Sequence, residues 1–366
     1  FAQPGLGGPV GFAGGDYPRA FPLPDRRVLW MFQDVFWSDD DDLRDSLTSA
    51  AHNGGLIQDG GCFTRFGGPG VNAIGNDITI PLSRWFWPLD GELGHDGAFW
   101  LFMVEMVNPS GTGADHGAVP ASTWVARLDP VTLSVISFAP APDPGPRLYG
   151  WSVVSDTTHS YLFGHCYRQF VDDVDGPAQF DESCMPHAWL ARVPVGRFDQ
   201  APEYWTGSGW SGNAGAAVPV MSRGFANPMS VQWFGDTFVS VSKVGDWWGA
   251  TIEIDVATSP TGPWQKAETI WTIGDRKCGE CGNYGAFALP WLDDDGRMTI
   301  ALSNGAPFHL WYEDASLYRP TFYSVEVPGP STADPPLDRG FGHVAGTSGL
   351  VPVDPVRLVD TREAGA

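Results

Sequence analysis

Basic residues are scarce in this 366-residue sequence, with 21 Lys and Arg against 43 Asp and Glu, which gives a formal net charge of −22. A surface of that charge would repel a nucleic-acid backbone or an anionic lipid surface. Long apolar runs are also missing, since none approaches the roughly 20 residues that a membrane-spanning helix needs. The sequence therefore predicts a soluble protein that neither binds nucleic acid nor spans a membrane. It begins at Phe1 rather than Met, as a processed, mature chain would.

Cysteine is scarcer still, with five residues in the whole chain. Cys278 and Cys281 lie in the segment KCGEC, and Cys166 and Cys184 flank a polar loop. Two disulfides with a free Cys62 would be the usual arrangement in an exported protein. A zinc site is the alternative, but it would need two more Cys or His ligands at metal spacing, and the eight His are dispersed. We therefore expect an exported protein with two disulfides.

Long stretches with apolar residues at helical spacing are absent, and a β-type unit recurs instead. Each unit is an apolar strand, an acidic or Gly-containing turn, and a second apolar strand. The second strands begin at Val28, Ala98, Ser160, Thr237 and Arg297, at intervals of 70, 62, 77 and 60 residues. The sequence therefore predicts a nearly all-β protein with five copies of the unit.

Intervals of this size fit four-stranded blades with loops. Candidate outer strands follow most of the strand pairs, at 124–129, 189–194, 251–259 and 322–327. We predict an all-β fold, a five-bladed β-propeller over residues 1–328, followed by a Pro-rich linker and tail over residues 329–366. A pair of β-sandwiches is the alternative architecture, but its strands would recur every 8 to 12 residues or so.

The first strand pair turns around Asp25, so antiparallel pairing sets residues whose numbers sum to about fifty opposite each other. Asp16 then faces Asp34, with Cβ atoms about 4.5–5.5 Å apart. A retaining glycosidase needs two carboxyl groups about 5–5.5 Å apart, and their repulsion keeps one of them protonated. Asp16 and Asp34 are therefore the candidate catalytic residues. The alternatives are a β-bulge that breaks this register, or an Asp34 that only caps a turn.

The same pairing brings the ends of the other four strand pairs to the rim that carries the two acids. The candidate sugar-binding side chains on this rim are Glu105, Tyr149, Asn227, Lys243, Tyr284 and Asn304. Glu105 would be a third carboxylate that tunes the pair, or a solvated strand end. Lys243 would donate to sugar hydroxyls or neutralise the acids, unless it is an ordinary surface lysine.

Two further segments carry candidate substrate-binding residues. HNGGLIQDGG contributes His52, Asn53 and Asp59, and its small residues would let a ligand approach the backbone; a turn that leads into a buried strand is the alternative. Trp247, beside Trp248 in a Gly-flanked loop, would form a stacking platform for a sugar face, or pack in the core.

The acidic segment at residues 39–45, DDDDLRD, has the composition of a calcium loop but lacks EF-hand spacing. We favour a solvated acidic loop there. The expected chemistry requires no metal or other cofactor, although a structural calcium ion is compatible with a propeller.

The segment GGDYPRAFPLPDRRVLWMFQDVFW, followed by HNGGLIQDGG, resembles the opening of a bacterial propeller family long catalogued as of unknown function. Its characterised members are endo-D-arabinanases, and the usual opening reads GGD, a strand, LWxFGDT, and later HNS with VQDG. The matching residues are Gly14, Gly15, Asp16, Leu29, Trp30, Asp34, His52, Asn53, Gln58, Asp59 and Gly60. The chain departs from this opening at Gln33, Val35 and Gly54, which replace Gly, Thr and Ser.

The resemblance implies an endo-acting, anomer-retaining hydrolase of α-D-arabinofuranosidic links in mycobacterial arabinogalactan and lipoarabinomannan. It assigns Asp16 as nucleophile and Asp34 as acid/base, two roles that could be exchanged. It also implies a bacterial protein that is secreted or associated with the cell surface, and the segment PVRLVDTR resembles an element of surface-associated proteins from high-GC Gram-positive bacteria.

Two other functions are compatible with the same sequence. ATSPTGPW resembles the outer-blade signature of other five-bladed furanosidases, so a hydrolase of plant L-arabinan or of fructan is one alternative. A non-catalytic carbohydrate-binding propeller is the other, and the opposed acids argue against it.

Overall fold

The computed structural model describes residues 11–38, 50–68, 70–77, 84–108, 118–143, 145–167, 169–170, 179–180, 183–222, 229–244, 248–272, 274 and 276–328. Within these ranges the helical segments are short: η2 (Ala214–Ala216), α1 (Phe308–Trp311) and η4 (Ala315–Tyr318). No helix among the described residues has the length and apolarity needed to cross a membrane.

The described strands form five main antiparallel sheets, numbered here as blades in chain order. Blade 1 contains β2 (Arg19–Pro22), β3 (Val28–Phe32), β6 (Gly54–Asp59) and β7 (Cys62–Phe66). Blade 2 contains β8 (Arg84–Leu93), β9 (Phe99–Val107), β10 (Val119–Leu128) and β11 (Val135–Pro140). Blade 3 contains β12 (Ser152–Ser155), β13 (His159–His165), β16 (His187–Pro194), β17 (Glu203–Trp205), β18 (Trp210–Ser211) and β19 (Met221–Ser222).

The last two blades follow the same order. Blade 4 contains β20 (Ser230–Phe234), β21 (Thr237–Val244), β22 (Thr251–Ala257) and β23 (Gln265–Trp271). Blade 5 contains β24 (Gly282–Leu292), β25 (Met298–Gly305) and β26 (Thr321–Val325). Two small sheets are separate from the blades: β14 (Gln169–Phe170) with β15 (Gln179–Phe180), and β1 (Gly11–Gly15) with β4 (Val35–Ser38) and β5 (Ala50–Ala51).

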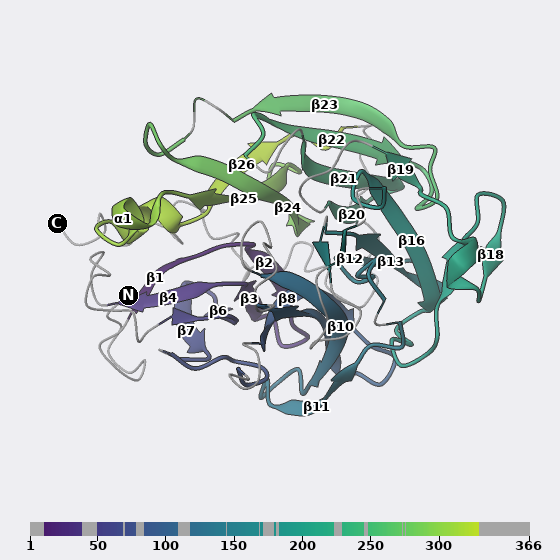
Figure 1. Ribbon diagram of the computed structural model, residues 1–366, viewed down its shortest axis with the longest axis horizontal. Helices are drawn as coiled ribbons and strands as arrows, with labels where there is room; N and C mark the ends of the chain where they lie inside the picture. The colour runs from purple at the N-terminus through teal and green to yellow at the C-terminus, as the bar shows by residue number, and fades with distance from the viewer. Residues whose placement is uncertain are drawn as a thin grey trace.

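The five sheets close into a ring around the innermost strands. β2 contacts β8, β8 contacts β12, β12 contacts β20, β20 contacts β24, and β24 contacts β2. Figure 1 looks down this ring, with the sheets arranged around the centre and the outer strands β11, β18 and β23 at the periphery. This closed cycle is the five-bladed β-propeller that the sequence predicts.

The hydrophobic core is divided among the five interfaces between neighbouring blades. Each interface holds one cluster of buried side chains, drawn from the facing sheets. In blade 1, Leu29 packs toward blade 2 and Trp30 packs toward blade 5, where Leu289 belongs to the same cluster. A strand covered on both faces needs apolar residues at successive positions, which explains the uninterrupted run VLWMF of β3.

The first hairpin keeps the predicted register on both sides of the acids. Arg19 pairs with Met31 between β2 and β3, and Gly15 pairs with Val35 between β1 and β4. Both strands are interrupted at the level of Asp16 and Asp34, where the small β1–β4–β5 sheet separates from blade 1. The acids therefore occupy a break in the hairpin, on the rim where the inner strands begin. We call this face the acid rim and the opposite face the turn rim.

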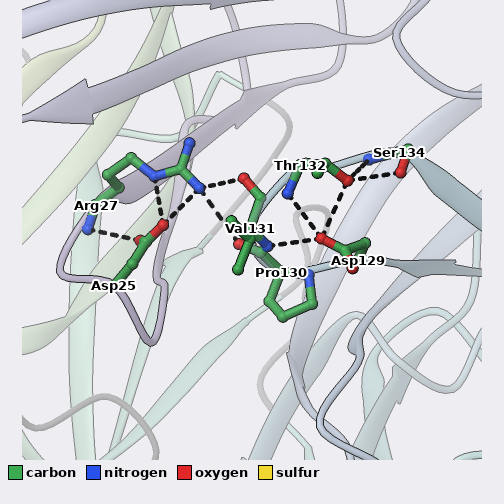
Figure 2. Close-up of polar contacts among 7 residues, drawn as sticks. All are labelled: Asp25, Arg27, Asp129, Pro130, Val131, Thr132 and Ser134. Carbon is green, nitrogen blue, oxygen red and sulfur yellow. Dashed lines mark hydrogen bonds and ion pairs between the residues drawn. The ribbon is translucent and has the colours of Figure 1, made fainter.

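On the turn rim, Arg27 joins blade 1 to blade 2, as Figure 2 shows. Its Nε donates to Asp25 Oδ2 at 2.7 Å, and its Nη2 donates to the carbonyl oxygen of Val131 in the turn between β10 and β11. Asp129 stabilises that turn by accepting from the backbone N–H groups of Val131 and Thr132. This contact fixes the β2–β3 turn, and with it the register that sets Asp16 opposite Asp34.

Several sequence predictions are confirmed by the fold. All five strand pairs form. Cys166 is bonded to Cys184 and Cys278 to Cys281, which leaves Cys62 as an exposed free thiol and removes Cys278 and Cys281 from any zinc site. The acidic segment 39–45 and the predicted tail 329–366 lie outside the described residues.

Candidate active site

Asp16 and Asp34 are linked directly through their backbones. The Asp34 N–H donates to Asp16 Oδ1 at 2.9 Å, and the Asp16 N–H donates to the Asp34 carbonyl oxygen at 3.2 Å. Two glycines before Asp16 permit this close approach. A Cβ on Gly15 would lie 2.9 Å from the Phe32 ring and 3.0 Å from the Asp34 carbonyl oxygen, and one on Gly14 would lie 3.2 Å from the Ala315 carbonyl oxygen. The GGD sequence is thus required by the packing around the acid.

The Asp16 carboxyl group is buried beneath blade 5. Tyr284 on β24 donates its hydroxyl proton to Asp16 Oδ2 at 2.6 Å, and the Tyr318 hydroxyl of η4 also hydrogen-bonds this carboxyl group. Burial, followed by repulsion from the Asp34 charge, raises the pKa of Asp16 to about 7, although these hydrogen bonds and the one from Asp34 oppose the rise. Burial and the charge of Asp16 also hold the pKa values of both tyrosines well above their ordinary range, so both remain protonated donors.

Asp34 is more open, with 30% of its side chain exposed. Its Oδ1 accepts from Trp87 Nε1 at 2.9 Å and lies 3.0 Å from His52 Nδ1. The His52 ring stacks on Trp85 with ring centroids 4.7 Å apart. Two donors aimed at one oxygen stabilise negative charge there. Blade 2 therefore supports Asp34, as blade 5 supports Asp16.

The charge of Asp34 also acts on His52. Burial lowers the pKa of His52, but the hydrogen bond to Asp34, the Asp34 charge and the charge of Asp77 outweigh burial and leave it raised. A protonated His52 beside Asp34 would reduce the net charge of the acid pair. Its side chain is 40% exposed, so it borders the solvent side of the site.

The backbone of Tyr17 holds the chain in a fixed conformation immediately after Asp16. Its backbone adopts φ 47°, a left-handed conformation that non-glycine residues seldom occupy. Its N–H donates to Ser303 Oγ at 2.9 Å, and its ring lies 5.6 Å from the Tyr284 ring and 6.1 Å from the Trp151 ring. Strained backbone at such a position is found where a side chain must be held in one orientation, and here that side chain is Asp16.

The structure brings two of the predicted substrate-binding residues against the acids: Tyr284 contacts Asp16 and His52 contacts Asp34. Tyr149 lines a separate pocket in blade 3. Trp248, the neighbour of the predicted Trp247, is 45% exposed and packs edge-on against Tyr284 with ring centroids 5.2 Å apart. Asn227 and Trp247 themselves lie outside the described residues.

Other candidates have structural partners that account for them. Asn53 is fully buried, and its side chain bonds the backbones of Ile74 and Phe86. Glu105 is buried and accepts hydrogen bonds from Ser122 and Trp124 within blade 2.

The remaining three candidates also differ from expectation. Asn304 is buried and donates to the Arg319 carbonyl oxygen and to Thr321 Oγ1. Lys243 is fully buried within β21, so it is not a surface lysine. Asp59 is exposed at the far end of β6, on the turn rim, because β6 runs away from the acids after Gly54.

Sequence reasoning missed Trp85, Trp87, Tyr318 and Tyr167. Trp85 and Trp87 are two residues apart in β8, so both lie on one face of the strand. Because β8 begins on the acid rim, this spacing could have predicted that the two tryptophans lie near the acids. Tyr318 lies in a 3₁₀ turn beyond the second strand of blade 5, where no strand pattern could locate it. Among the described residues, no group of three or more His, Cys, Asp or Glu side chains is arranged to hold a metal ion.

The fold and the rim define a class: five-bladed β-propellers with a pair of linked carboxyl groups and aromatic side chains on one face. The chain belongs to the family described as Domain of unknown function (DUF5005), whose model matches residues 9–328. No curated protein matches it.

Several solved structures have similar folds at low sequence identity. The GH43_1 enzyme from Xanthomonas citri complexed with xylotriose is 14% identical, with 87% of this chain and 88% of that chain covered and a TM-score of 0.49. RS223-β-xylosidase is 13% identical, with coverage of 90% and 97% and a TM-score of 0.48. A glycoside hydrolase family 43 arabinoxylan arabinofuranohydrolase from Bacillus subtilis, in complex with cellotetraose, is 12% identical, with coverage of 92% and 68% and a TM-score of 0.45.

Proposed function

We propose that the protein is a glycoside hydrolase that cleaves α-D-arabinofuranosidic bonds within mycobacterial arabinan, with retention of anomeric configuration. The observation that carries this proposal is the Asp16–Asp34 pair, in which the N–H of one acid is 2.9 Å from a carboxylate oxygen of the other. The charge of Asp34 also acts on the pKa of Asp16, so the two carboxyl groups lose their protons as a pair. With the pKa of Asp16 raised to about 7, the pair holds one proton near neutral pH, as a nucleophile and an acid require.

The surroundings of the two acids support one assignment of roles. Asp16 is buried and has hydrogen-bond donors on both carboxylate oxygens, which orient it and would stabilise its carboxylate, so we assign it as nucleophile. Because the raised pKa places the shared proton on Asp16 in the free protein, this assignment requires that the proton pass to Asp34 when the substrate binds. Asp34 is partly exposed, so it can give its proton to a leaving oxygen and later take one from water.

In the first step Asp16 attacks the anomeric carbon while Asp34 protonates the departing oxygen, so the glycosidic bond breaks and a covalent glycosyl ester forms. In the second step Asp34 removes a proton from water, and the resulting hydroxide attacks the anomeric carbon. The ester bond breaks, Asp16 leaves as a carboxylate, and both acids return to their starting states.

The choice of D-arabinan depends on the opening motif. Three of its polar members, Asp16, Asp34 and His52, converge in one site, and Gly14 and Gly15 allow the close packing around Asp16. The exposed Trp248 beside Tyr284 would offer a ring to a sugar face next to the acids. We propose that the protein works outside the cytoplasm, at a bacterial surface or secreted, because its two disulfides persist in oxidising compartments.

The test is to incubate the purified protein with mycobacterial arabinogalactan, plant L-arabinan and a fructan, and to separate the released products by chromatography. A ladder of oligosaccharides from arabinogalactan alone supports the proposal. A ladder from L-arabinan or fructan instead would assign a different furanosidase. Tight binding without hydrolysis of any of the three would identify a carbohydrate-binding propeller.

A further inference from the structure

A pocket of about 540 Å³ opens on the acid rim in blade 3, beside the acids rather than around them. It is lined by the chain before β12, by the two residues that follow β13, and by the segment that leads into β16. Pockets that bind small organic ligands usually measure roughly 300–1,000 Å³, so this pocket has the volume of a ligand site.

The pocket occupies the place in blade 3 that the acids occupy in blade 1. Asp16 is three residues before the inner strand β2, and Tyr149 is three residues before the inner strand β12. Asp34 is two residues beyond the end of β3, and Tyr167 is two residues beyond the end of β13. Because the blades repeat around one axis, both tyrosines face the same side of the propeller as the acids.

Buried aromatic rings pack between the pocket and the acids. The ring of Tyr17, the residue after Asp16, lies 6.1 Å from the Trp151 ring, which lies 6.1 Å from the Tyr167 ring on the pocket wall. Burial raises the pKa of Tyr167, and the charges of Asp16 and Asp34 raise it further. The wall of the pocket that carries Tyr167 therefore lies within electrostatic range of both acids, and a chain bound at the acids would extend toward it.

The walls of the pocket combine flat apolar surface with fixed donors. The Arg147 guanidinium lies 3.9 Å from the centroid of the Trp189 ring and donates to the Ala214 carbonyl oxygen at 2.7 Å. The Nδ1 atom of His187 lies 2.7 Å from Ser222 Oγ. The other ring nitrogen, Nε2, is therefore the one that would donate to a ligand. The Cys166–Cys184 disulfide completes the wall and anchors Tyr167. Aromatic faces with donors beside them suit an uncharged, polyhydroxylated sugar.

We propose that this pocket is a subsite that binds a sugar residue of the glycan chain next to the residues at the cleavage point, with Arg147 and His187 donating to its hydroxyls. The proposal rests on the proposed function and adds a second point of contact to it. Occupancy of the pocket adds binding energy only for chains long enough to reach it, so longer oligosaccharides become better substrates.

The test compares kcat/KM for a short activated arabinofuranoside and for arabino-oligosaccharides of increasing length. Arg147→Ala and His187→Ala each remove one donor from the lining of the pocket. Arg192→Ala is the matched control, because Arg192 lies 4.3 Å from the Trp210 ring and pairs with Glu203 on the outer part of the same blade. Titration of a long oligosaccharide into Asp34→Asn, with and without Arg147→Ala, measures binding without turnover.

In the unmodified protein, kcat/KM should rise with chain length. Each pocket variant should reduce the ratio of long-substrate to short-substrate kcat/KM by about ten-fold, and Arg147→Ala should weaken oligosaccharide binding by a similar factor. Arg192→Ala should leave the ratio unchanged. In a contrary outcome, the unmodified protein cleaves arabinan while the pocket variants have the same ratio of long-substrate to short-substrate kcat/KM as Arg192→Ala and bind the oligosaccharide unchanged. That result would show that the pocket is not a subsite, and the proposed function would stand. If the unmodified protein cleaves no arabinan at any length, the proposed function itself fails.

Discussion

The amide N–H of Asp34 donates a 2.9 Å hydrogen bond to Oδ1 of Asp16, so the peptide group that carries one acid orients the other. The Asp16 side chain cannot move far without losing this bond. Burial is the main cause of the raised pKa of Asp16, and the charge of Asp34 raises it further. The position of Asp16 and its affinity for a proton therefore both depend on its place beside Asp34 in the buried part of the site.

The first prediction concerns the pH dependence of activity. Because the pKa of Asp16 is raised to about 7, the pair should lose its remaining proton near neutral pH, and the acid needed for leaving-group protonation is lost with it. The kcat/KM profile should therefore fall as pH rises through about 7. Initial rates between pH 4 and 9 measure this, and a profile flat to pH 9 would contradict the shared proton.

The second prediction concerns the pH dependence of stability. In the unfolded chain Asp16 releases its proton near 3.8, but in the folded protein it keeps the proton until about 7. Between these values the folded state binds more protons, so this group lowers the free energy of unfolding as pH rises. Asp16→Asn removes the effect and should gain stability over the unmodified protein by on the order of a few kcal/mol between pH 4 and 8.

Denaturant unfolding at several pH values measures this difference. Asp199→Asn is the control, because Asp199 is a partly exposed carboxylate whose pKa is lowered, mainly by its hydrogen bond to Arg197. Asp199 titrates below the tested pH range. The difference in free energy of unfolding between Asp199→Asn and the unmodified protein should therefore not change with pH in that range. A constant difference for Asp16→Asn as well would show that Asp16 titrates normally.

The third prediction concerns the indole that supports Asp34. Trp87→Phe keeps an aromatic ring but removes the N–H donated to Asp34 Oδ1. A hydrogen bond to a charged group contributes about 1.5–3 kcal/mol, so kcat/KM should fall by about 10-fold to 100-fold. Trp100→Phe breaks an equivalent 3.0 Å bond to Asp96 on the turn side of blade 2 and should leave activity intact. Equal kcat/KM values for Trp87→Phe and Trp100→Phe would show that Trp87 does not contribute to catalysis.

The fourth prediction concerns Asn53, which the sequence placed among the substrate-binding residues. Its side chain bonds the N–H and carbonyl of Ile74 and the carbonyl of Phe86, all buried. Asn53→Ala leaves these groups unpaired and should lower the free energy of unfolding by on the order of 3 kcal/mol. Asn213→Ala, which removes an exposed cap from η2, should cost about 1 kcal/mol. A similar small cost for both would show that Asn53 has no structural role.

The sequence predicts the propeller and the acid pair because both depend on local patterns. The turn at Asp25 and the strands around it set the register, and the observed pairing of Arg19 with Met31 follows from that arithmetic. The glycines of GGD also carried a local signal, since any Cβ on Gly15 would approach Phe32 too closely.

The supporting side chains could not be predicted from strand pattern because they come from other blades. Tyr284 and Tyr318 reach Asp16 only when blade 5 closes against blade 1, and Trp87 reaches Asp34 only when blade 2 does. Asp59 was assigned to the site by its proximity to His52 in sequence, but six residues of extended β6 carry it to the opposite rim. Val35 and Gly54 both depart from the motif and lie together, since a Cβ on Gly54 would be 2.7 Å from Val35 Cγ1.

The central claim is that Asp16 and Asp34 together hydrolyse a glycosidic bond. The most direct measurement is the rate of release of reducing ends from D-arabinan by the unmodified protein, Asp16→Asn, Asp34→Asn and the control Asp199→Asn, each with its fold verified by circular dichroism. The account predicts that each acid-pair variant is slower by about 10²–10⁴-fold or more, while the control keeps its full rate. Activity in both acid-pair variants equal to that of the control would contradict it.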